Sequence, residues 1–182
     1  MKMIILSIII MTATLSAFVQ NSKTLVVYYS RTGNAEAVAK QIQTLTNADL
    51  FRVETVKAYP EGYHETTEVA KEEKNNNARP EIKTKVENID QYDTVFIGFP
   101  IWWGTYPMVI ATFIESHNLK GKTIIPFCTH GGGSVDQGFN DVEKLTKESK
   151  HEEGFSLSGS RANSSQADIE KWLRKILSLQ EG

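Results

Sequence analysis

Short apolar runs alternate with segments of helical periodicity from residue 24 onward. The runs cover residues 24–29, 49–53, 93–99, 122–128 and, more weakly, 154–158. Helices are expected over residues 33–46, 62–74, 108–115, 135–147 and from Ser164 or Ser165 to Leu177. In the first of these, one helical face carries Ala35, Val38, Ala39, Ile42 and Leu45. Strands that alternate with helices predict parallel pairing with right-handed crossovers. We therefore predict an α/β fold of three layers, with a doubly wound, five-stranded parallel sheet.

The segment 54–90 is longer than a usual crossover between parallel strands. Its composition indicates a turn at Pro60, a solvated helix over 62–74, a loop through Pro80 and a short helix near Val86.

The fourth strand contains Pro126, which is awkward in a central strand because proline donates no hydrogen bond. A bulge or a strand end is therefore expected nearby.

The first 22 residues differ from the rest of the chain. Lys2 precedes an almost continuously apolar stretch, and small residues follow as far as Ala17. This order is typical of a secretory signal peptide cleaved near Ala17, and the apolar stretch is short for a membrane span. We therefore expect export to the periplasm or cell envelope and a domain over 23–182. The alternative is an N-terminal extension, with Met3 or Met11 as an internal start, on a cytoplasmic protein.

Composition narrows the possible partners. The 182 residues are 40% hydrophobic, enough for a substantial core, and the net charge of −2 gives no basic footprint for nucleic acid. Cys128 is the only cysteine, which excludes an internal disulfide framework and a multi-cysteine metal site. His64, Glu68 and Glu72 recur every four residues, a spacing that favours a solvated helix face over a metal site. We expect a monomer without structural metal.

The first strand ends in a loop suited to an anion. The loop consists of Ser30, Arg31, Thr32, Gly33, Asn34 and Ala35, and a helical pattern follows it. A helix N-terminus offers free backbone N–H groups and the positive end of the helix dipole. Ser30 and Thr32 add hydroxyl donors, and Gly33 allows the backbone to approach a ligand closely. This loop predicts a phosphate site.

Two further loops of unusual composition follow the third and fourth strands. The first contains Pro100, Ile101, Trp102, Trp103 and Gly104, and the second contains Thr129, His130, Gly131, Gly132 and Gly133. In a parallel sheet all three loops lie at the carboxyl edge, where such folds bind ligands. Adjacent tryptophans cannot both point into one core from a regular strand, so at least one is expected to face a ligand or partner. A flat aromatic beside a phosphate loop suits a flat ring with a phosphate tail.

Together these loops resemble those of the flavodoxin family. Ser30, Thr32, Gly33 and Asn34 match the family's phosphate loop, T/S-x-T-G-x-T, whereas Ala35 replaces its final threonine and removes one hydroxyl donor. The loops at 100–104 and 129–133 resemble the two isoalloxazine loops. The resemblance covers residues 24–177 and implies strand order 2-1-3-4-5, FMN as the cofactor and single-electron shuttling between redox partner proteins. It also assigns all sixteen residues of the three loops to cofactor binding.

Several alternatives remain open at the level of sequence. The chain could be an FMN-dependent NAD(P)H:quinone-type oxidoreductase on the same fold, or a flavin-free binding module. A phosphorylatable receiver domain is disfavoured because Tyr29 and Ser30 stand where acidic residues are needed. Trp103 precedes a glycine, as in the family pattern, but either tryptophan could stack on the flavin. His130 could approach the ring or face solvent.

Overall fold

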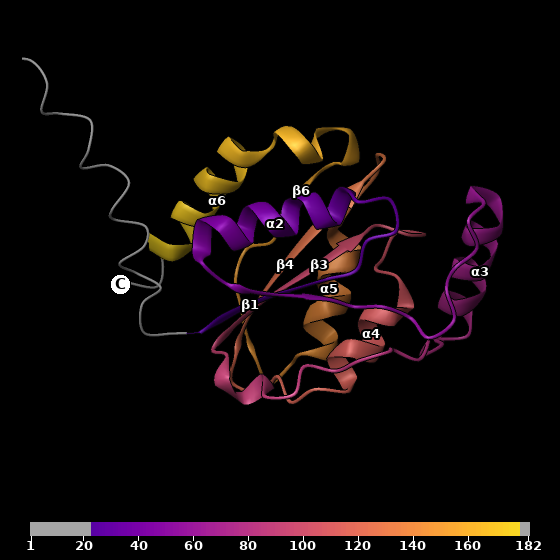
Figure 1. Cartoon of the computed structure of the whole chain (residues 1–182), viewed down its shortest axis with the longest axis horizontal. Helices are drawn as coiled ribbons and strands as arrows, with labels where there is room; N and C mark the ends of the chain where they lie inside the picture. The colour runs from indigo at the N-terminus through magenta and orange to yellow at the C-terminus, as the bar shows by residue number, and fades with distance from the viewer. Residues whose placement is uncertain (1–22, 179–182) are drawn as a thin grey trace, which may run out of the picture.

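The computed structural model describes residues 23–178, and side chains through residue 176. The strands are β1 (Thr24–Tyr28), β2 (Asp49–Arg52), β3 (Thr94–Pro100), β4 (Thr123–His130), β5 (Lys150–His151) and β6 (Phe155–Ser158). They form one parallel sheet in the order β2-β1-β3-β4, with β5 and β6 both paired to β4 (Figure 1). The predicted doubly wound sheet and its strand order are confirmed.

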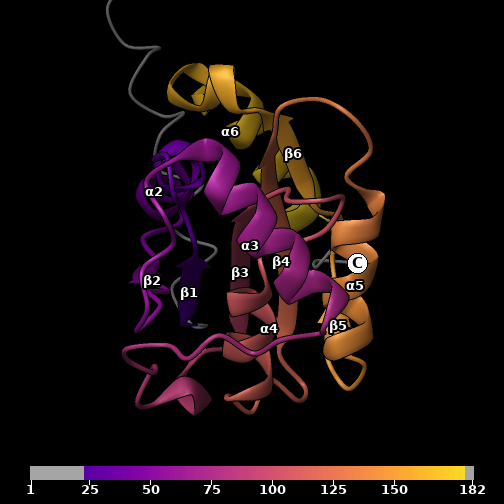
Figure 2. The same cartoon turned by 90° about the vertical axis from the view of Figure 1, so that its right-hand side faces the viewer.

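Helices cover both faces of the sheet and complete the three layers. Helices α2 (Asn34–Thr46) and α6 (Gln166–Ser178) lie on one face, and α4 (Met108–Glu115) and α5 (Asp136–Leu145) lie on the other (Figure 2). Each pair packs side by side, and a separate cluster of buried apolar side chains fills the space between each pair and the sheet.

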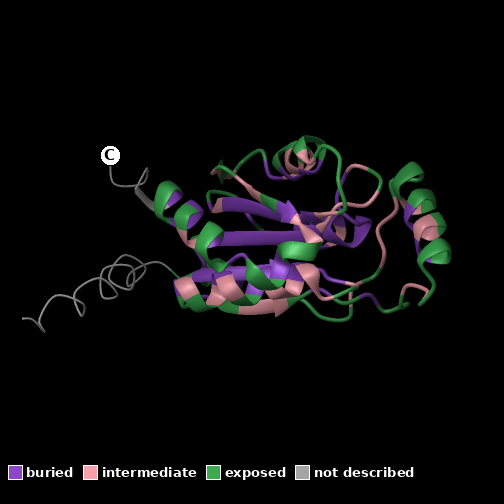
Figure 3. Cartoon of the chain, turned by 90° about the horizontal axis from the view of Figure 1, so that it is seen from above, coloured by how far each residue is buried: buried purple, intermediate pink, exposed green. Residues whose placement is uncertain are grey.

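Strand β1 shows why the central strands read as continuous apolar runs. All five of its residues are buried, and successive side chains alternate between the two cores. Leu25 and Val27 belong to the core under α4 and α5, whereas Val26 and Tyr28 belong to the core under α2 and α6. A strand covered on both faces has no polar side, as Figure 3 shows for the centre of the sheet.

Pro126 explains why two short strands, β5 and β6, pair with β4 along the edge of the sheet where a single strand was expected. The carbonyl of Ile124 accepts a hydrogen bond from Glu152 on the edge side of β4, so the missing N–H of Pro126, two residues on, faces the same side. Pairing of β4 with β5 ends at Ile124, and pairing with β6 begins at Phe127. The expected fifth strand is thus β6, and the additional strand β5 precedes it along the same edge. The expected bulge or strand end in the fourth strand is wrong, because β4 runs through Pro126 and pairs with β3 in unbroken register; only the pairing at its other edge is divided.

The segment between β2 and β3 contains α3 (Tyr63–Asn75), close to the predicted helix over 62–74. Figure 1 shows α3 apart from the three layers, beyond the carboxyl ends of the strands. The short helix expected near Val86 forms three residues later, as a single 3₁₀ turn at Ile89–Gln91 in which Ile89 is buried in the core.

The predicted signal peptide lies in residues 1–22, outside the described residues. Between residues 23 and 178, none of the helices is both long and apolar enough to cross a membrane. Within the same range, no group of three or more His, Cys, Asp or Glu side chains is arranged to hold a metal ion.

Candidate functional site

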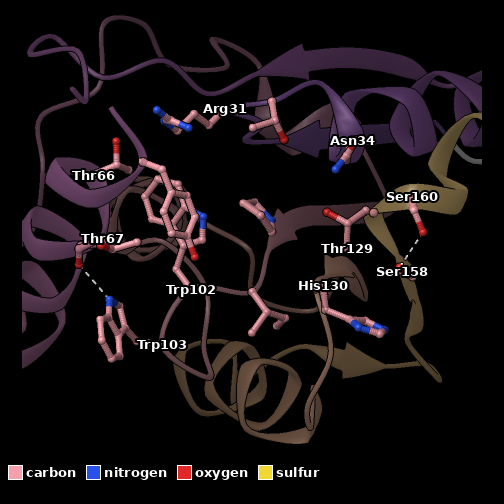
Figure 4. Close-up of a pocket in the computed structure, with 17 residues that line it drawn as sticks. Arg31, Asn34, Thr66, Thr67, Trp102, Trp103, Thr129, His130, Ser158 and Ser160 are labelled. Atoms are coloured by element: carbon pink, nitrogen blue, oxygen red, sulfur yellow. Dashed lines mark hydrogen bonds between the residues drawn. The ribbon is translucent and has the colours of Figure 1, made fainter. Parts of the chain in front are cut away.

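A cavity of about 740 Å³ lies at the carboxyl edge of the sheet, with walls from all three predicted loops. The predicted residues that line it are Arg31, Thr32, Asn34, Pro100, Ile101, Trp102, Trp103, Thr129, His130 and Gly131. The volume falls within the range typical of small-molecule sites. Figure 4 shows Trp102 and Trp103 on one side of the cavity and Thr129 and His130 on the other, with Arg31 and Asn34 along a third side.

Six predicted residues do not line this cavity: Ser30, Gly33, Ala35, Gly104, Gly132 and Gly133. Ser30 and Gly33 shape the loop instead. The Ser30 hydroxyl oxygen accepts a hydrogen bond from the Gly33 N–H at 3.1 Å, and Gly33 has the left-handed φ of 88° that favours glycine.

The N-terminus of α2 is left open beside the cavity. Gly33 occupies the N-cap position and has no side chain with which to cap the helix. The first amides of a helix lack intrahelical partners, and capping side chains usually satisfy them. Asn34 and Thr32 line the cavity at this point. The arrangement can therefore accept an anion on backbone N–H groups.

Ala35 is 1% exposed in the first turn of α2 and does not line the cavity. The sequence assigned position 35 to cofactor binding because the related threonine carries a hydroxyl. Here the side chain is buried and carries no hydroxyl that could donate to a ligand.

A tight turn presents the two tryptophans. Trp102 and Thr105 exchange backbone hydrogen bonds of 2.8 and 3.1 Å, with Trp103 and Gly104 at the tip. Both tip residues are left-handed, with φ of 51° and 83°, as a two-residue turn of the primed type requires. Glycine adopts this conformation freely, but a bulky residue such as Trp103 rarely does, and such strain concentrates at functional sites. The Thr105 hydroxyl donates to Asp141 of α5 at 2.8 Å and anchors the turn.

The two tryptophans are held by different contacts. Trp102 is half-buried, with its ring edge-on to Tyr29 and Tyr59 at centroid distances of 5.6 and 5.1 Å. Trp103 is 47% exposed, its indole N–H donates to the Thr67 carbonyl of α3 at 2.8 Å, and Lys71 lies 5.2 Å from its ring centroid. Both tryptophans reach the cavity and Trp103 is exposed, while the expectation that one of them faces a ligand or partner stays a prediction.

The loop after β4 forms the opposite wall. Thr129 is buried, whereas His130 is partly exposed and its Nδ1 accepts a hydrogen bond from the Gly132 N–H at 3.2 Å. Because Nδ1 is the acceptor, the neutral ring carries its proton on Nε2. Gly132 and Gly133 have φ of 128° and 86° and form an exposed turn beyond the cavity.

Sequence reasoning missed two groups of lining residues. The first follows β6 and contains Ser158, Gly159 and Ser160. The rule that placed the other loops at the carboxyl edge applies to this one too. A side chain at Gly159 would collide with Asn34, since its Cβ would come within 2.4 Å of Nδ2. The second group, Tyr63, Thr66, Thr67 and Ala70, lies on α3, where the charged composition of the helix suggested only a solvated face.

Arg31 connects the phosphate loop to the segment before α3. Its guanidinium donates hydrogen bonds to the carbonyls of Pro60, at 3.2 Å, and Glu61. The cation therefore stands at the cavity and also fixes the start of α3.

Burial raises the pKa of several titratable side chains near the cavity and in the core. It raises the pKa of Tyr29, and burial together with a 2.6 Å hydrogen bond to Glu73 raises the pKa of Tyr59. Burial also raises the pKa of Glu73, helped by the neighbouring Glu72 and opposed by the Tyr59 hydroxyl. The pKa of the Cys128 thiol is raised to about 12 by burial, so this cysteine is a neutral core residue.

The fold and the site together define a doubly wound α/β protein with a cavity whose walls suit a flat ring with an anionic tail. The flavodoxin family profile matches residues 23–176. The chain therefore belongs to the flavodoxin family, whose cofactor is FMN.

Solved structures show the same relationship. A candidate flavoprotein from Bacteroides eggerthii is 37% identical with a TM-score of 0.77, covering 86% of this chain and 98% of the other. A candidate flavoprotein from Bacteroides uniformis is 30% identical with a TM-score of 0.76, covering 85% and 99%. A flavoprotein from Lactobacillus acidophilus, crystallised in complex with FMN, shares the fold with a TM-score of 0.68 at 20% identity over 82% and 99%. A comparison with curated proteins gives no match.

Proposed function

We propose that the chain binds FMN in this cavity and transfers single electrons through it to redox partner proteins. The observation that carries the proposal is the convergence of an uncapped helix N-terminus and an aromatic wall on one cavity. The phosphate fits the amides at the start of α2, beside Thr32 and Arg31. The flavin ring fits between the tryptophan turn and the loop at 129–131.

Bound FMN supplies the electron transfer, and the protein supplies binding, orientation and a controlled environment. The rings of Tyr29 and Tyr59 fix Trp102, so this wall needs little rearrangement when a ligand binds. Tyr29 and Tyr59 stay neutral because burial raises their pKa, so they place no negative charge behind the ring.

Photoreduction of the FMN-loaded chain tests single-electron transfer. We expect reduction in two resolved one-electron steps, each with its own absorption change. Reduction in one unresolved two-electron step would contradict the role of an electron carrier.

A second candidate is an FMN-dependent NAD(P)H:quinone-type oxidoreductase. The position of α3 favours it, because four residues of this helix close one side of the cavity that a carrier could leave open. Sustained NAD(P)H oxidation by the FMN-loaded protein with a quinone as acceptor would support this candidate over the carrier.

The N-terminal sequence supports a further proposal, export from the cytoplasm. N-terminal sequencing of the protein from its native cells should find a chain that begins after Ala17. An intact Met1 on the cytosolic protein would contradict export.

A further inference from the structure

Helix α3 contributes a wall that the flavin site does not require. The proposed FMN site uses the phosphate loop, the tryptophan turn and the loop after β4. Thr66 and Thr67 lie on the side of Trp102 and Trp103 (Figure 4), and Tyr63 and Ala70 of the same helix also line the cavity.

This wall is apolar in practice although two of its residues are threonines. The Thr66 hydroxyl donates to the carbonyls of Pro60 and Gly62 at 2.7 and 2.8 Å, and the Thr67 hydroxyl donates to the carbonyl of His64 at 2.7 Å. Both donors are thus committed to the backbone before any ligand arrives. Ala70 adds only a methyl group and Tyr63 adds a ring with one hydroxyl, so the wall offers mainly contact area and no charge.

Aromatic rings at the same place remain open to solvent. Of the large apolar side chains exposed in residues 23–176, Val56, Tyr63 and Trp103, the last two line this cavity. Tyr63 is 79% exposed. Exposed aromatic surface that gathers at a cavity marks a binding site more often than scattered exposure does.

The cations near this wall are already engaged. Lys74 Nζ donates to the Trp103 carbonyl at 2.6 Å, and Lys71 lies over the Trp103 ring. Neither lysine lines the cavity, and the four wall residues carry no charge. The chemistry therefore selects an uncharged partner with flat, exposed faces.

We propose that the α3 side of the cavity binds a second, uncharged, flat aromatic molecule of one or two rings alongside FMN. The inference rests on the proposed FMN site, because the second molecule occupies space that FMN leaves free. Quinones belong to this chemical class, and such a ligand would be held within reach of the flavin.

Equilibrium dialysis of menadione against the FMN-loaded full chain tests the site. We expect saturable binding that falls about tenfold in Tyr63→Ala and is retained in Tyr63→Phe, because the ring and not the hydroxyl provides the contact. His64→Ala is the matched control, since His64 is the exposed neighbour on α3 and does not line the cavity. It should bind menadione as the wild type does.

Ala70→Leu provides a second variant that acts by filling the space. It should abolish menadione binding, because the larger side chain occupies the space beside α3. Menadione binding that is absent in the FMN-loaded wild type, or equal in all variants, would overturn the inference while the FMN site stands. Loss of FMN in Tyr63→Ala and Ala70→Leu would also overturn it, because the wall would then belong to the flavin site. Failure of the wild type to bind FMN would instead refute the proposed function.

Discussion

The sheet with its flanking helices and helix α3 are stabilised by different interactions. In the sheet, β1 is wholly buried, and α4 buries six of its eight residues. In α3, only Thr66 and Ala70 are buried among thirteen residues. That helix is fixed chiefly by polar contacts: Arg31 to the turn before it, Trp103 to Thr67, Lys74 to Trp103, and Tyr59 to Glu73.

This difference separates stability from ligand binding. Buried apolar area stabilises the body, whereas hydrogen bonds at the surface contribute little each and open readily. Elements with few buried contacts have the lowest local stability, and ligand-binding segments are drawn from them. We therefore expect changes in α3 to alter binding and local opening, and changes in the sheet to alter global folding.

The largest contrast should appear in global stability. Phe96 is buried in β3 and packs edge-on against Trp172 at 5.8 Å. Phe96→Ala should lower the free energy of unfolding by about 3–5 kcal/mol, because it leaves a cavity in the core. Tyr63→Ala on α3 should change it by less than about 0.5 kcal/mol. Urea unfolding measures both, and equal losses would remove the distinction between the two regions.

The next largest effect is expected on FMN affinity, at Trp103, where the loop after β3 contacts α3. Trp103→Ala removes the hydrogen bond from the indole N–H to the Thr67 carbonyl. It also removes an aromatic ring that lines the cavity. FMN affinity should fall about tenfold, as expected for loss of an aromatic contact and its buried area.

His117→Ala is the comparison for this substitution. His117 lies outside the FMN cavity, where its Nε2 accepts the Val86 N–H at 3.0 Å. This variant should lose stability but keep its FMN affinity. Equal affinities for Trp103→Ala and His117→Ala in a fluorescence titration would remove Trp103 from the site.

A smaller effect is expected at the start of α3. Arg31→Gln removes the hydrogen bonds to the carbonyls of Pro60 and Glu61. Amide exchange in residues 62–67 should accelerate about threefold, the size expected for a weak net hydrogen bond, while exchange in the sheet stays unchanged. Arg52→Gln is a matched control in β2, where the guanidinium donates to the Ser30 carbonyl at 3.1 Å. It should leave the exchange of α3 unchanged.

The smallest effect is a pH dependence carried by Glu73. Burial raises the pKa of this carboxyl above its ordinary value of 4.5, so the folded state binds its proton more tightly than the unfolded chain does. The resulting stability is fully present below the ordinary pKa and is lost as the pH rises through the raised value. Glu73→Gln removes this contribution. The difference in unfolding free energy between wild type and variant should therefore decline with rising pH, and a rise instead would contradict the assigned direction.

The sequence predicted the sheet well because strands buried on both faces appear in the sequence as continuous apolar runs. Runs such as residues 93–99 are apolar throughout, and the glycine-rich and tryptophan loops follow them at the expected edge. The placement of α3 against the cavity could not be predicted, because backbone carbonyls of Pro60, Glu61 and Thr67 accept the bonds that fix it. Every residue has such a carbonyl, so the sequence carries no signal for these contacts. The burial of Ala35 agrees with the apolar face that the sequence predicts for the helix over 33–46, whereas the family resemblance assigned the same residue to cofactor binding.

FMN binding at the three loops is the central claim, and a fluorescence titration of the full-length apoprotein with FMN tests it most directly. We predict saturable quenching of flavin fluorescence at one FMN per chain, with the ring enclosed between Trp102 and the loop at 129–131. Riboflavin, which lacks the phosphate, should bind more weakly because the open N-terminus of α2 would then have no anion to accept. An apoprotein that leaves FMN fluorescence unchanged, or that binds riboflavin as tightly as FMN, would contradict the account.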